Sequence, residues 1–244
     1  MLYILFGFLL LLMLGVIIYI LKVKIEPPIT NEPRTKTEVQ FIHPGWNIDD
    51  GNSLIKNHYG IWELRLSGSP EHIGHCFGAL TNQAGLFEKQ EEAFVSEIKN
   101  RMPSSRYLTF IKYLVGWFNR DLEHYVPVEY QKEIYASSKY MSDKFDDIAP
   151  KYHRGLNYHA AHDIGHALQN MNLVGCTSFG LWDDKVEDGG MVIGRNFDFY
   201  FGQEFAKDKI VAFFQPDSGY AFASVTWACF SGVVSGINEK GLTI

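Results

Sequence analysis

The apolar side chains divide the chain into an apolar first segment, a helical middle part and a β-rich last part. The first 21 residues carry no charged side chain, and as a helix they would extend roughly 32 Å, enough to span a bilayer core. A cleavable signal peptide, the alternative, usually has a basic start, a shorter apolar run and a small-residue cleavage site. None of these is evident, so we expect residues 1–22 to form a single-pass transmembrane anchor.

Residues 23–58 contain four prolines and scattered charges, a composition typical of a linker. The run GIWELRLSG then alternates apolar and polar positions, which predicts a strand. Directly after it, Ser69 and Pro70 are the residue types of a helix N-cap and a first helical position. We therefore expect the folded body to begin near residue 59.

Apolar residues then recur with the spacing of amphipathic helices as far as about residue 170. The pattern predicts four helical segments separated by prolines: 71–100, 104–122, 128–147 and 151–170. The apolar positions of the second segment are expected to face a core: Leu108, Ile111, Val115 and Phe118. Residues 59–175 are thus predicted to form a mainly helical segment.

From Leu173 onward, short β-rich runs separated by turn residues replace the helical pattern. Their spacing suits an antiparallel meander, and no strong helix is predicted after Cys176. A sheet with one apolar face needs a covering layer, and the final GLTI has the character of a strand interior. We expect residues 176–244 to begin a β-rich domain whose C-terminal part lies outside this chain. The predicted fold class is α+β.

Composition narrows the possible partners and cofactors. The formal net charge is −6 and no dense Lys/Arg run occurs, so nucleic-acid binding is not expected. The three cysteines lack the spacing of a disulfide scaffold or a zinc site, and we expect neither a metal nor a cofactor. Cys76 and Cys229 are predicted to be buried and inert. The oligomeric state does not follow from the sequence.

Cys176 differs from a typical core cysteine because small and polar residues flank it in VGCTSFG. Cysteine reacts as the thiolate, which a nearby cation stabilises. A hairpin through Gly189 and Gly190 could return Arg195 beside Cys176, and Asp198 follows three residues later. A nucleophile, a cation and an orienting carboxylate are parts that an acyl-transfer site needs.

A histidine base is missing from this set, because all nine histidines precede Cys176. Cleavage between Gly175 and Cys176 would supply one, since the new α-amino group would have a pKa of about 7.7–8.0. Such an amine can serve as the base for its own side chain, as in N-terminal threonine nucleophiles. Gly175 suits the cut because a small residue leaves its carbonyl open to attack by the thiol.

Three motifs carry a resemblance to a known family. GCTSF, GRNFDFY and GINEKGL resemble N-terminal-nucleophile (Ntn) hydrolases of the choloylglycine hydrolase and penicillin acyltransferase type. Among these, the acyl-coenzyme A:6-aminopenicillanic acid acyltransferase-like family is the most similar, and LSGSPEHIGHCFGALT resembles its pro-segment motif. The similarity covers roughly residues 61–82 and 172–244.

The resemblance implies a four-layer αββα sandwich preceded by a helical pro-segment, and autoproteolysis at the Gly175–Cys176 bond. It makes Cys176 the nucleophile and, after cleavage, the α-amine base. Arg195 would be the guanidinium beside the thiol, and Asp198 the carboxylate that holds the amine. The resemblance gives supporting roles to Asn196, Thr177 and Asn238. Asn238 belongs to the turn formed by GINEKGL. The family's oxyanion asparagine would lie beyond Ile244.

The expected substrate is therefore a small-molecule acyl amide or thioester, attacked by Cys176 in an amidohydrolase or acyltransferase reaction. An enzyme of exogenous amides would have an extracytoplasmic body, although basic residues after the anchor favour a cytoplasmic flank. One alternative is a membrane-anchored zinc enzyme or phosphohydrolase with its site in HAAHDIGHAL. This run resembles the H-E-x-x-H zinc pattern, with an aspartate in place of the glutamate, and the site would consist of His159, His162, Asp163 and His166. Another alternative is a membrane-tethered binding protein without catalysis.

Overall fold

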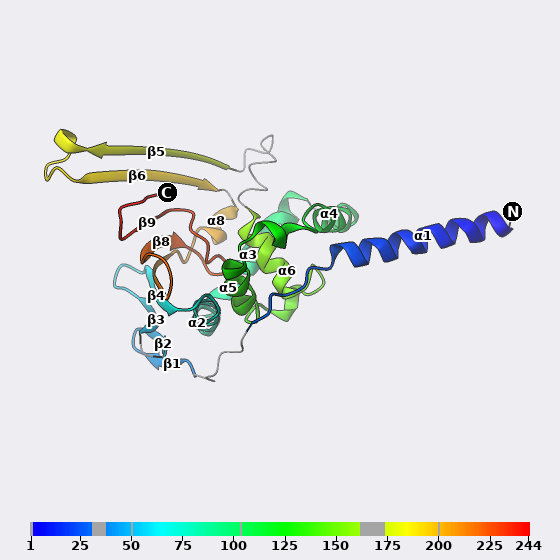
Figure 1. The fold of residues 1–244 in the computed structure, drawn as a ribbon, viewed down its shortest axis with the longest axis horizontal. Helices are drawn as coiled ribbons and strands as arrows, with labels where there is room; N and C mark the ends of the chain where they lie inside the picture. The colour runs from blue at the N-terminus through cyan, green and yellow to red at the C-terminus, as the bar shows by residue number, and fades with distance from the viewer. Residues whose placement is uncertain (1, 31–37, 50, 103, 162–173, 200) are drawn as a thin grey trace.

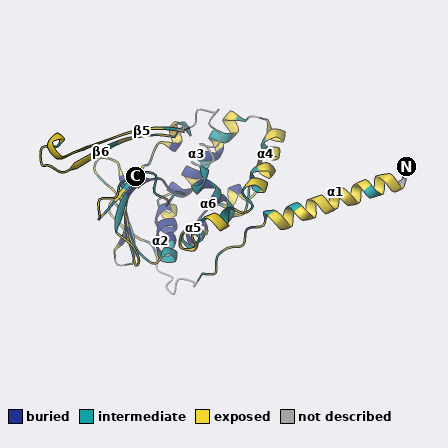
Figure 2. Cartoon of the chain, turned by 45° about the horizontal axis from the view of Figure 1, so that its top comes forward, coloured by how far each residue is buried: buried dark blue, intermediate teal, exposed yellow. Residues whose placement is uncertain are grey.

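The computed structural model describes residues 2–30, 38–49, 51–102, 104–161, 174–199 and 201–244 of the chain, and these form a mixed α+β structure. A first helix, α1 (Leu2–Val23), extends away from the body and is exposed along its length (Figures 1 and 2). Its span Tyr3–Val23 is long and apolar enough to cross a membrane. The predicted N-terminal apolar helix is thus confirmed.

The body is built on a seven-stranded sheet in the order β1-β2-β3-β4-β7-β8-β9. All neighbours are antiparallel except β4 and β7, which pair in parallel and join the two halves of the chain. The strands are β1 (Gln40–Ile42), β2 (Gly45–Ile48), β3 (Asn52–Lys56), β4 (Trp62–Gly68), β7 (Ile210–Pro216), β8 (Phe222–Thr226) and β9 (Gly236–Asn238).

One face of this sheet forms the core and the other is largely exposed. On β4, Trp62, Leu64 and Leu66 are buried and alternate with partly or fully exposed Glu63 and Arg65, as the sequence predicted. β7 repeats the alternation. The buried face packs against helices, so the described sheet and helices form two layers.

The helices occupy the middle of the chain and gather on one side of the sheet (Figure 1). The α-helices are α2 (Pro70–Gln83), α3 (Leu86–Arg101), α4 (Ser105–Phe118), α5 (Val128–Ser138), α6 (Lys151–His159) and the four-residue α8 (Gly202–Phe205). Short 3₁₀ turns are η1 (Leu122–Tyr125), η2 (Asp143–Phe145) and η4 (Asp183–Lys185).

Helix α2 is the central element, and its sequence explains its position. Ser69 caps its first turn by accepting a hydrogen bond from the His72 N–H, and Pro70 occupies the first turn, both as predicted. A Cβ on Gly74 would lie 2.1 Å from the Glu133 carbonyl oxygen, and one on Gly78 2.5 Å from the Tyr140 ring. These two glycines, one helical turn apart, therefore let α5 pack closely on α2.

Two expectations about the first half need correction. The range 23–58 is not a linker throughout, because β1, β2 and β3 lie within it and extend the sheet. Its fourth proline, Pro44, lies in the turn between β1 and β2, where a missing N–H interrupts no ladder. The segment 71–100 is two helices, because Gly85 adopts a positive φ of 69° between α2 and α3.

Helix α4 does not contribute a buried stripe to the core. None of its residues is buried, and Phe118 is 72% exposed. It packs instead beside the C-terminal end of α1, where Tyr19 stacks on Trp117 and its hydroxyl donates to the Tyr113 carbonyl at 2.8 Å. Apolar periodicity identified the helix correctly, but it could not tell a core face from a face beside another apolar helix.

The last part of the chain does not form one meander. β5 (Val174–Trp182) and β6 (Met191–Phe199) pair only with each other, as a separate two-stranded hairpin. β7, β8 and β9 do form the predicted antiparallel order, but they do so on the edge of β4. The segments 59–175 and 176–244 therefore share one sheet and one core.

Candidate functional site

The candidate site lies on the β5–β6 hairpin, whose register determines which side chains share a face. Cys176 pairs with Phe197, and Ser178 pairs with Arg195. Because directly opposite residues point to the same side of an antiparallel pair and side chains alternate along each strand, these four residues occupy one face. Cys176 and Arg195 are diagonal neighbours on that face.

Arg195 is directed at the sulfur of Cys176 by contacts with a distant loop. Its Nη2 donates to Cys176 Sγ at 3.6 Å, while Nη1 donates to the Val234 carbonyl oxygen and to Ser235 Oγ, the latter at 2.9 Å. The guanidinium carbon of Arg195 also lies over the Phe197 ring, 5.3 Å from its centroid. Both Cys176 and Arg195 are exposed, so a substrate from solvent can reach the thiol.

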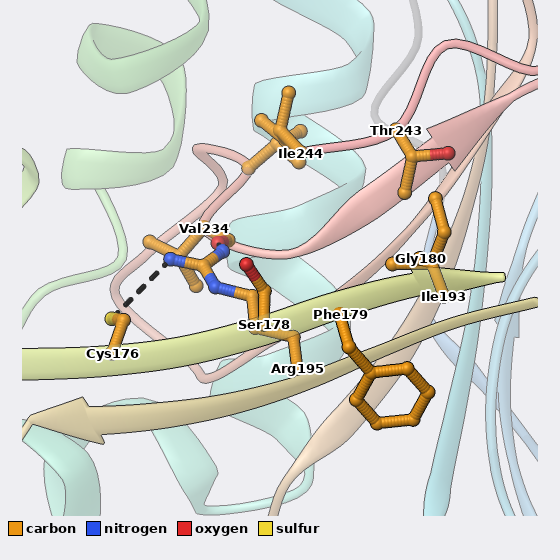
Figure 3. Close-up of a pocket in the computed structure, with 10 residues that line it drawn as sticks. Cys176, Ser178, Phe179, Gly180, Ile193, Arg195, Val234, Thr243 and Ile244 are labelled. Carbon is orange, nitrogen blue, oxygen red and sulfur yellow. Dashed lines mark hydrogen bonds between the residues drawn. The ribbon is translucent and has the colours of Figure 1, made fainter.

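An open cleft of about 630 Å³ borders the pair. Figure 3 shows the Cys176 thiol and the Arg195 guanidinium facing each other beneath the segment that carries Val234. The cleft is lined by Cys176, Ser178, Phe179, Gly180, Ile193, Arg195, Val233, Val234, Thr243 and Ile244. Most of these residues are apolar, so the cleft suits a ligand with an apolar part.

The other predicted polar residues lie on the opposite face of the hairpin. Asp198 pairs with Gly175, and Asn196 pairs with Thr177. Asn196 Nδ2 donates to Asp198 Oδ1 at 2.7 Å, which fixes the carboxylate. A Cβ on Gly175 would lie 4.0 Å from Asp198 Oδ2. The structure therefore places Asp198 beside the Gly175–Cys176 peptide rather than beside the thiol.

Asn238 has a structural role in the described residues. Its side-chain oxygen accepts the N–H groups of Lys240 and Leu242, each at 3.0 Å, at the turn after β9. It does not line the cleft. This agrees with the expectation that the GINEKGL motif forms a turn.

His159 is half-buried, and both of its ring nitrogens are engaged in hydrogen bonds. Nδ1 donates to the Gly155 carbonyl oxygen at 2.8 Å, and Nε2 accepts the Ser231 N–H at 3.0 Å. Burial lowers the pKa of His159, which the Gly155 hydrogen bond partly opposes. A neutral imidazole with both nitrogens occupied has no lone pair for a metal. The other residues of that alternative, His162, Asp163 and His166, lie outside the described residues.

The two remaining cysteines are buried, as predicted. Burial, with a contribution from the Asp49 carboxylate, raises the pKa of Cys76 to about 12. Burial raises the pKa of Cys229 well above its ordinary value, and its thiol donates to the Phe87 carbonyl oxygen at 3.3 Å. Neither thiol is a nucleophile at neutral pH.

Sequence reasoning missed the residues that orient Arg195. Val234 and Ser235 lie 39 and 40 positions after Arg195 in the sequence, between β8 and β9. No local motif marks them, because one contributes a backbone carbonyl and the other a single hydroxyl. Only the packing of this loop against the hairpin makes them part of the site.

No protein-family model matches the chain. An uncharacterized protein of Archaeoglobus fulgidus is 26% identical to it over 214 residues, which cover 82% of this chain and 34% of that protein. The chain thus spans about a third of the length of the relative that it matches. This similarity covers most of the chain, and the relative's description gives no activity.

Proposed function

We propose that the protein is a cysteine Ntn amidohydrolase or acyltransferase that cleaves itself between Gly175 and Cys176. One observation carries the proposal: the Arg195 guanidinium lies 3.6 Å from the Cys176 sulfur in an exposed, mostly apolar cleft. A cation beside the sulfur is one of the parts of a site in which cysteine acts as a nucleophile. Two of the motifs that resemble this family, GCTSF and GRNFDFY, contribute residues that line the cleft, and the third, GINEKGL, lies in the chain between the lining residues Val234 and Thr243.

Self-cleavage would proceed by attack of the Cys176 sulfur on the Gly175 carbonyl carbon. The C–S bond forms, the peptide C–N bond breaks, and the nitrogen takes a proton to become the Cys176 amine. Water then hydrolyses the thioester and leaves Gly175 with a carboxylate. Asp198 lies opposite Gly175 in the hairpin and would hold the new ammonium group by an ion pair.

In turnover, the thiolate of Cys176 would attack the carbonyl of an amide or thioester. The amine or thiol of the substrate leaves with a proton supplied by the Cys176 α-ammonium group, and an acyl-enzyme remains. Water, or an acceptor amine, then attacks the acyl-enzyme after the α-amine removes its proton. No metal or cofactor is needed for these steps.

The finer fold belongs to the same proposal. In a four-layer αββα sandwich, a second sheet would pack on the exposed face of the seven-stranded sheet, with helices outside it. Exposed apolar side chains on the hairpin are consistent with such a layer, including Phe179, Leu181 and Trp182.

We also propose that α1 anchors the protein in a membrane as a single-pass helix, with the body extracytoplasmic. Figure 1 shows α4 nearly end-on beside the C-terminal end of α1, which lies across the picture. Three aromatic residues meet at this junction: Tyr19, Tyr113 and Trp117. Tyrosine and tryptophan gather where a bilayer meets water, so this junction suits the membrane boundary.

The test is the intact mass of the purified wild-type protein beside Cys176→Ala and Cys176→Ser variants. The proposal expects a break between Gly175 and Cys176 in the wild type, none in the alanine variant, and slower cleavage in the serine variant. A folded wild-type protein that stays uncut would remove the α-amine base and with it this mechanism. A non-catalytic membrane-tethered protein would then be the better interpretation.

A further inference from the structure

A second group of reactive side chains lies away from the cleft, between the β2–β3 turn and helix α2. Asp49 follows β2, and His72 and Cys76 are one turn apart on α2. His72 Nε2 is 3.3 Å from Asp49 Oδ2 and 3.5 Å from Cys76 Sγ. One carboxylate oxygen, the ring nitrogen and the sulfur all lie within 4.8 Å of one another.

Hydrogen bonding alone does not account for this convergence. The Asn52 amide nitrogen is a third polar neighbour of His72 Nε2, at 3.4 Å. Its orientation is set because Asn52 Oδ1 accepts the Ser67 N–H at 2.7 Å. A ring nitrogen carries either one proton or one lone pair, so His72 Nε2 cannot satisfy an acceptor, a donor and a thiol together. The contact with Asp49 is also longer than an ordinary N–H···O bond.

The two distances measured from His72 Nε2, to Asp49 Oδ2 and to Cys76 Sγ, match the edges of a metal-centred tetrahedron. Zinc binds oxygen and nitrogen at about 2.0–2.1 Å and sulfur at about 2.3 Å. Tetrahedral angles then separate an oxygen and a nitrogen ligand by roughly 3.3 Å, and a nitrogen and a sulfur ligand by roughly 3.6 Å. We propose that Asp49, His72 and Cys76 bind a zinc ion, with water as the fourth ligand.

The backbone around Asp49 and His72 has unusual conformations that bear on the positions of these two side chains. Gly68 has a φ of 118°, and a Cβ there would lie 2.8 Å from His72 Cδ2, so the imidazole rests directly on this glycine. Asp49 adopts a φ of 57°, in the left-handed region that aspartate tolerates better than most residues. Gly68 thus leaves room for the imidazole of His72, and the turn that carries Asp49 brings its carboxylate to within 3.3 Å of His72 Nε2.

The site is partly closed, which suits a structural ion that can still be loaded from solvent. The Cys76 side chain belongs to the core, while about a quarter of each of the His72 and Asp49 side chains is exposed. The ion would tie the β2–β3 hairpin to α2 at the edge of the sheet. This donor set of one sulfur, one nitrogen and one oxygen suits zinc better than magnesium or calcium, which prefer oxygen alone.

Cobalt substitution tests the site directly, because a Co²⁺–thiolate bond absorbs in the near ultraviolet and tetrahedral Co²⁺ absorbs strongly in the visible. The full chain in detergent, stripped of metal and titrated with Co²⁺, is expected to give both absorptions, and excess Zn²⁺ is expected to remove them. Zinc analysis of the untreated protein is expected to find about one ion per chain.

Variants at each ligand separate this site from adventitious binding. Cys76→Ser is expected to abolish the near-ultraviolet absorption, and His72→Gln and Asp49→Asn to weaken Co²⁺ binding at least about tenfold. Cys229→Ser removes another buried thiol and is expected to bind as the wild type does. Asp49 and His72 are partly exposed, so their variants remain informative even if Cys76→Ser fails to fold.

Two results would overturn the proposal. One is a folded wild-type protein that gives no thiolate–cobalt absorption, and the other is a cobalt signal that persists in both Asp49→Asn and His72→Gln. Neither outcome depends on self-cleavage, because the zinc ligands and the residues lining the cleft have no member in common.

Discussion

The Arg195 guanidinium and the Cys176 thiol lie 3.6 Å apart although 19 residues separate them in the chain. They meet because the β5–β6 register places Arg195 opposite Ser178, two residues along the same face from Cys176. A shift of one residue in this register would move Arg195 to the opposite face. The pairing of the two strands, and the loop that holds the guanidinium, therefore decide whether the thiol has a cation beside it.

Replacing Arg195 should lower the reactivity of Cys176 without unfolding the protein. For Arg195→Ala we expect iodoacetamide alkylation at neutral pH to slow by about two- to fivefold, since an exposed charge contact contributes about 1 kcal/mol or less. Peptide-level mass spectrometry measures the rate at Cys176 separately from the buried thiols. The alkylation rate of Arg195→Lys should fall between the rates of the wild type and Arg195→Ala. An alanine variant that reacts as fast as the wild type would contradict the role of Arg195.

Glu133 should make the stability of the protein decrease with rising pH. Burial raises the pKa of its carboxyl to about 7, although a Ser231 hydrogen bond and the nearby Glu129 charge act in opposite directions. Because the folded-state pKa lies above the unfolded value, the stabilisation is complete below about pH 4.5 and is lost as pH rises through 7. The free energy of unfolding should fall by up to about 3 kcal/mol over this range on account of Glu133.

The variant Glu133→Gln isolates this effect because glutamine does not titrate. His159 has a lowered pKa, so its contribution to the free energy of unfolding is lost when pH falls, which is the opposite dependence. This contribution cancels in the comparison because His159 is present in both proteins. Denaturant unfolding of both at pH 5 and pH 8 gives the comparison. The stability of the wild type relative to Glu133→Gln should be lower at pH 8, and an equal difference at both pH values would argue against the effect.

The buried ion pair of Arg154 and Glu91 should be necessary for stability. Arg154 is 1% exposed, and its Nε donates to Glu91 Oε1 at 2.8 Å. Arg154→Met would leave the Glu91 carboxylate buried without its cation, and we expect a loss of about 3–5 kcal/mol in the free energy of unfolding. Lys207→Met, which breaks an exposed pair with Glu204, should cost less than about 1 kcal/mol. Equal losses in the two variants would show that burial does not matter here.

Trp117 should lie at the membrane boundary when the full chain is reconstituted in vesicles. It stacks on Tyr19 near the end of α1, and lipids brominated near the headgroup should quench its fluorescence. We expect Trp117→Phe to remove most of this quenching, whereas Trp62→Phe, which changes a core residue, should leave it nearly unchanged. Quenching that persists in Trp117→Phe would place α4 away from the bilayer.

Several features of the fold could be predicted from the sequence because they depend on neighbouring residues. The alternation of Trp62, Leu64 and Leu66, the cap at Ser69 and the long apolar first helix all follow local rules of geometry and solvation. The approach of Arg195 to Cys176 was also accessible, since two strands joined by a glycine turn bring their residues together.

Other features depend on contacts between distant residues. The parallel pairing of β4 with β7 joins segments about 150 positions apart and merges two expected domains into one sheet. The residue that lies opposite Asp198, Gly175, depends on a register that no sequence pattern records, and the orientation of Arg195 depends on Val234 and Ser235. The exposure of α4 likewise follows from what packs against it.

The sequence by itself thus determined the long apolar first helix, the main helices, most strands and the nucleophile candidate Cys176, because each is encoded by local periodicity or composition. Only the tertiary structure decided that β1–β3 extend the sheet, that Asp198 lies beside Gly175, and that Asp49, His72 and Cys76 converge. The physical reason is that such groupings are set by long-range strand pairing and helix packing, whose energies are shared among residues far apart in the chain.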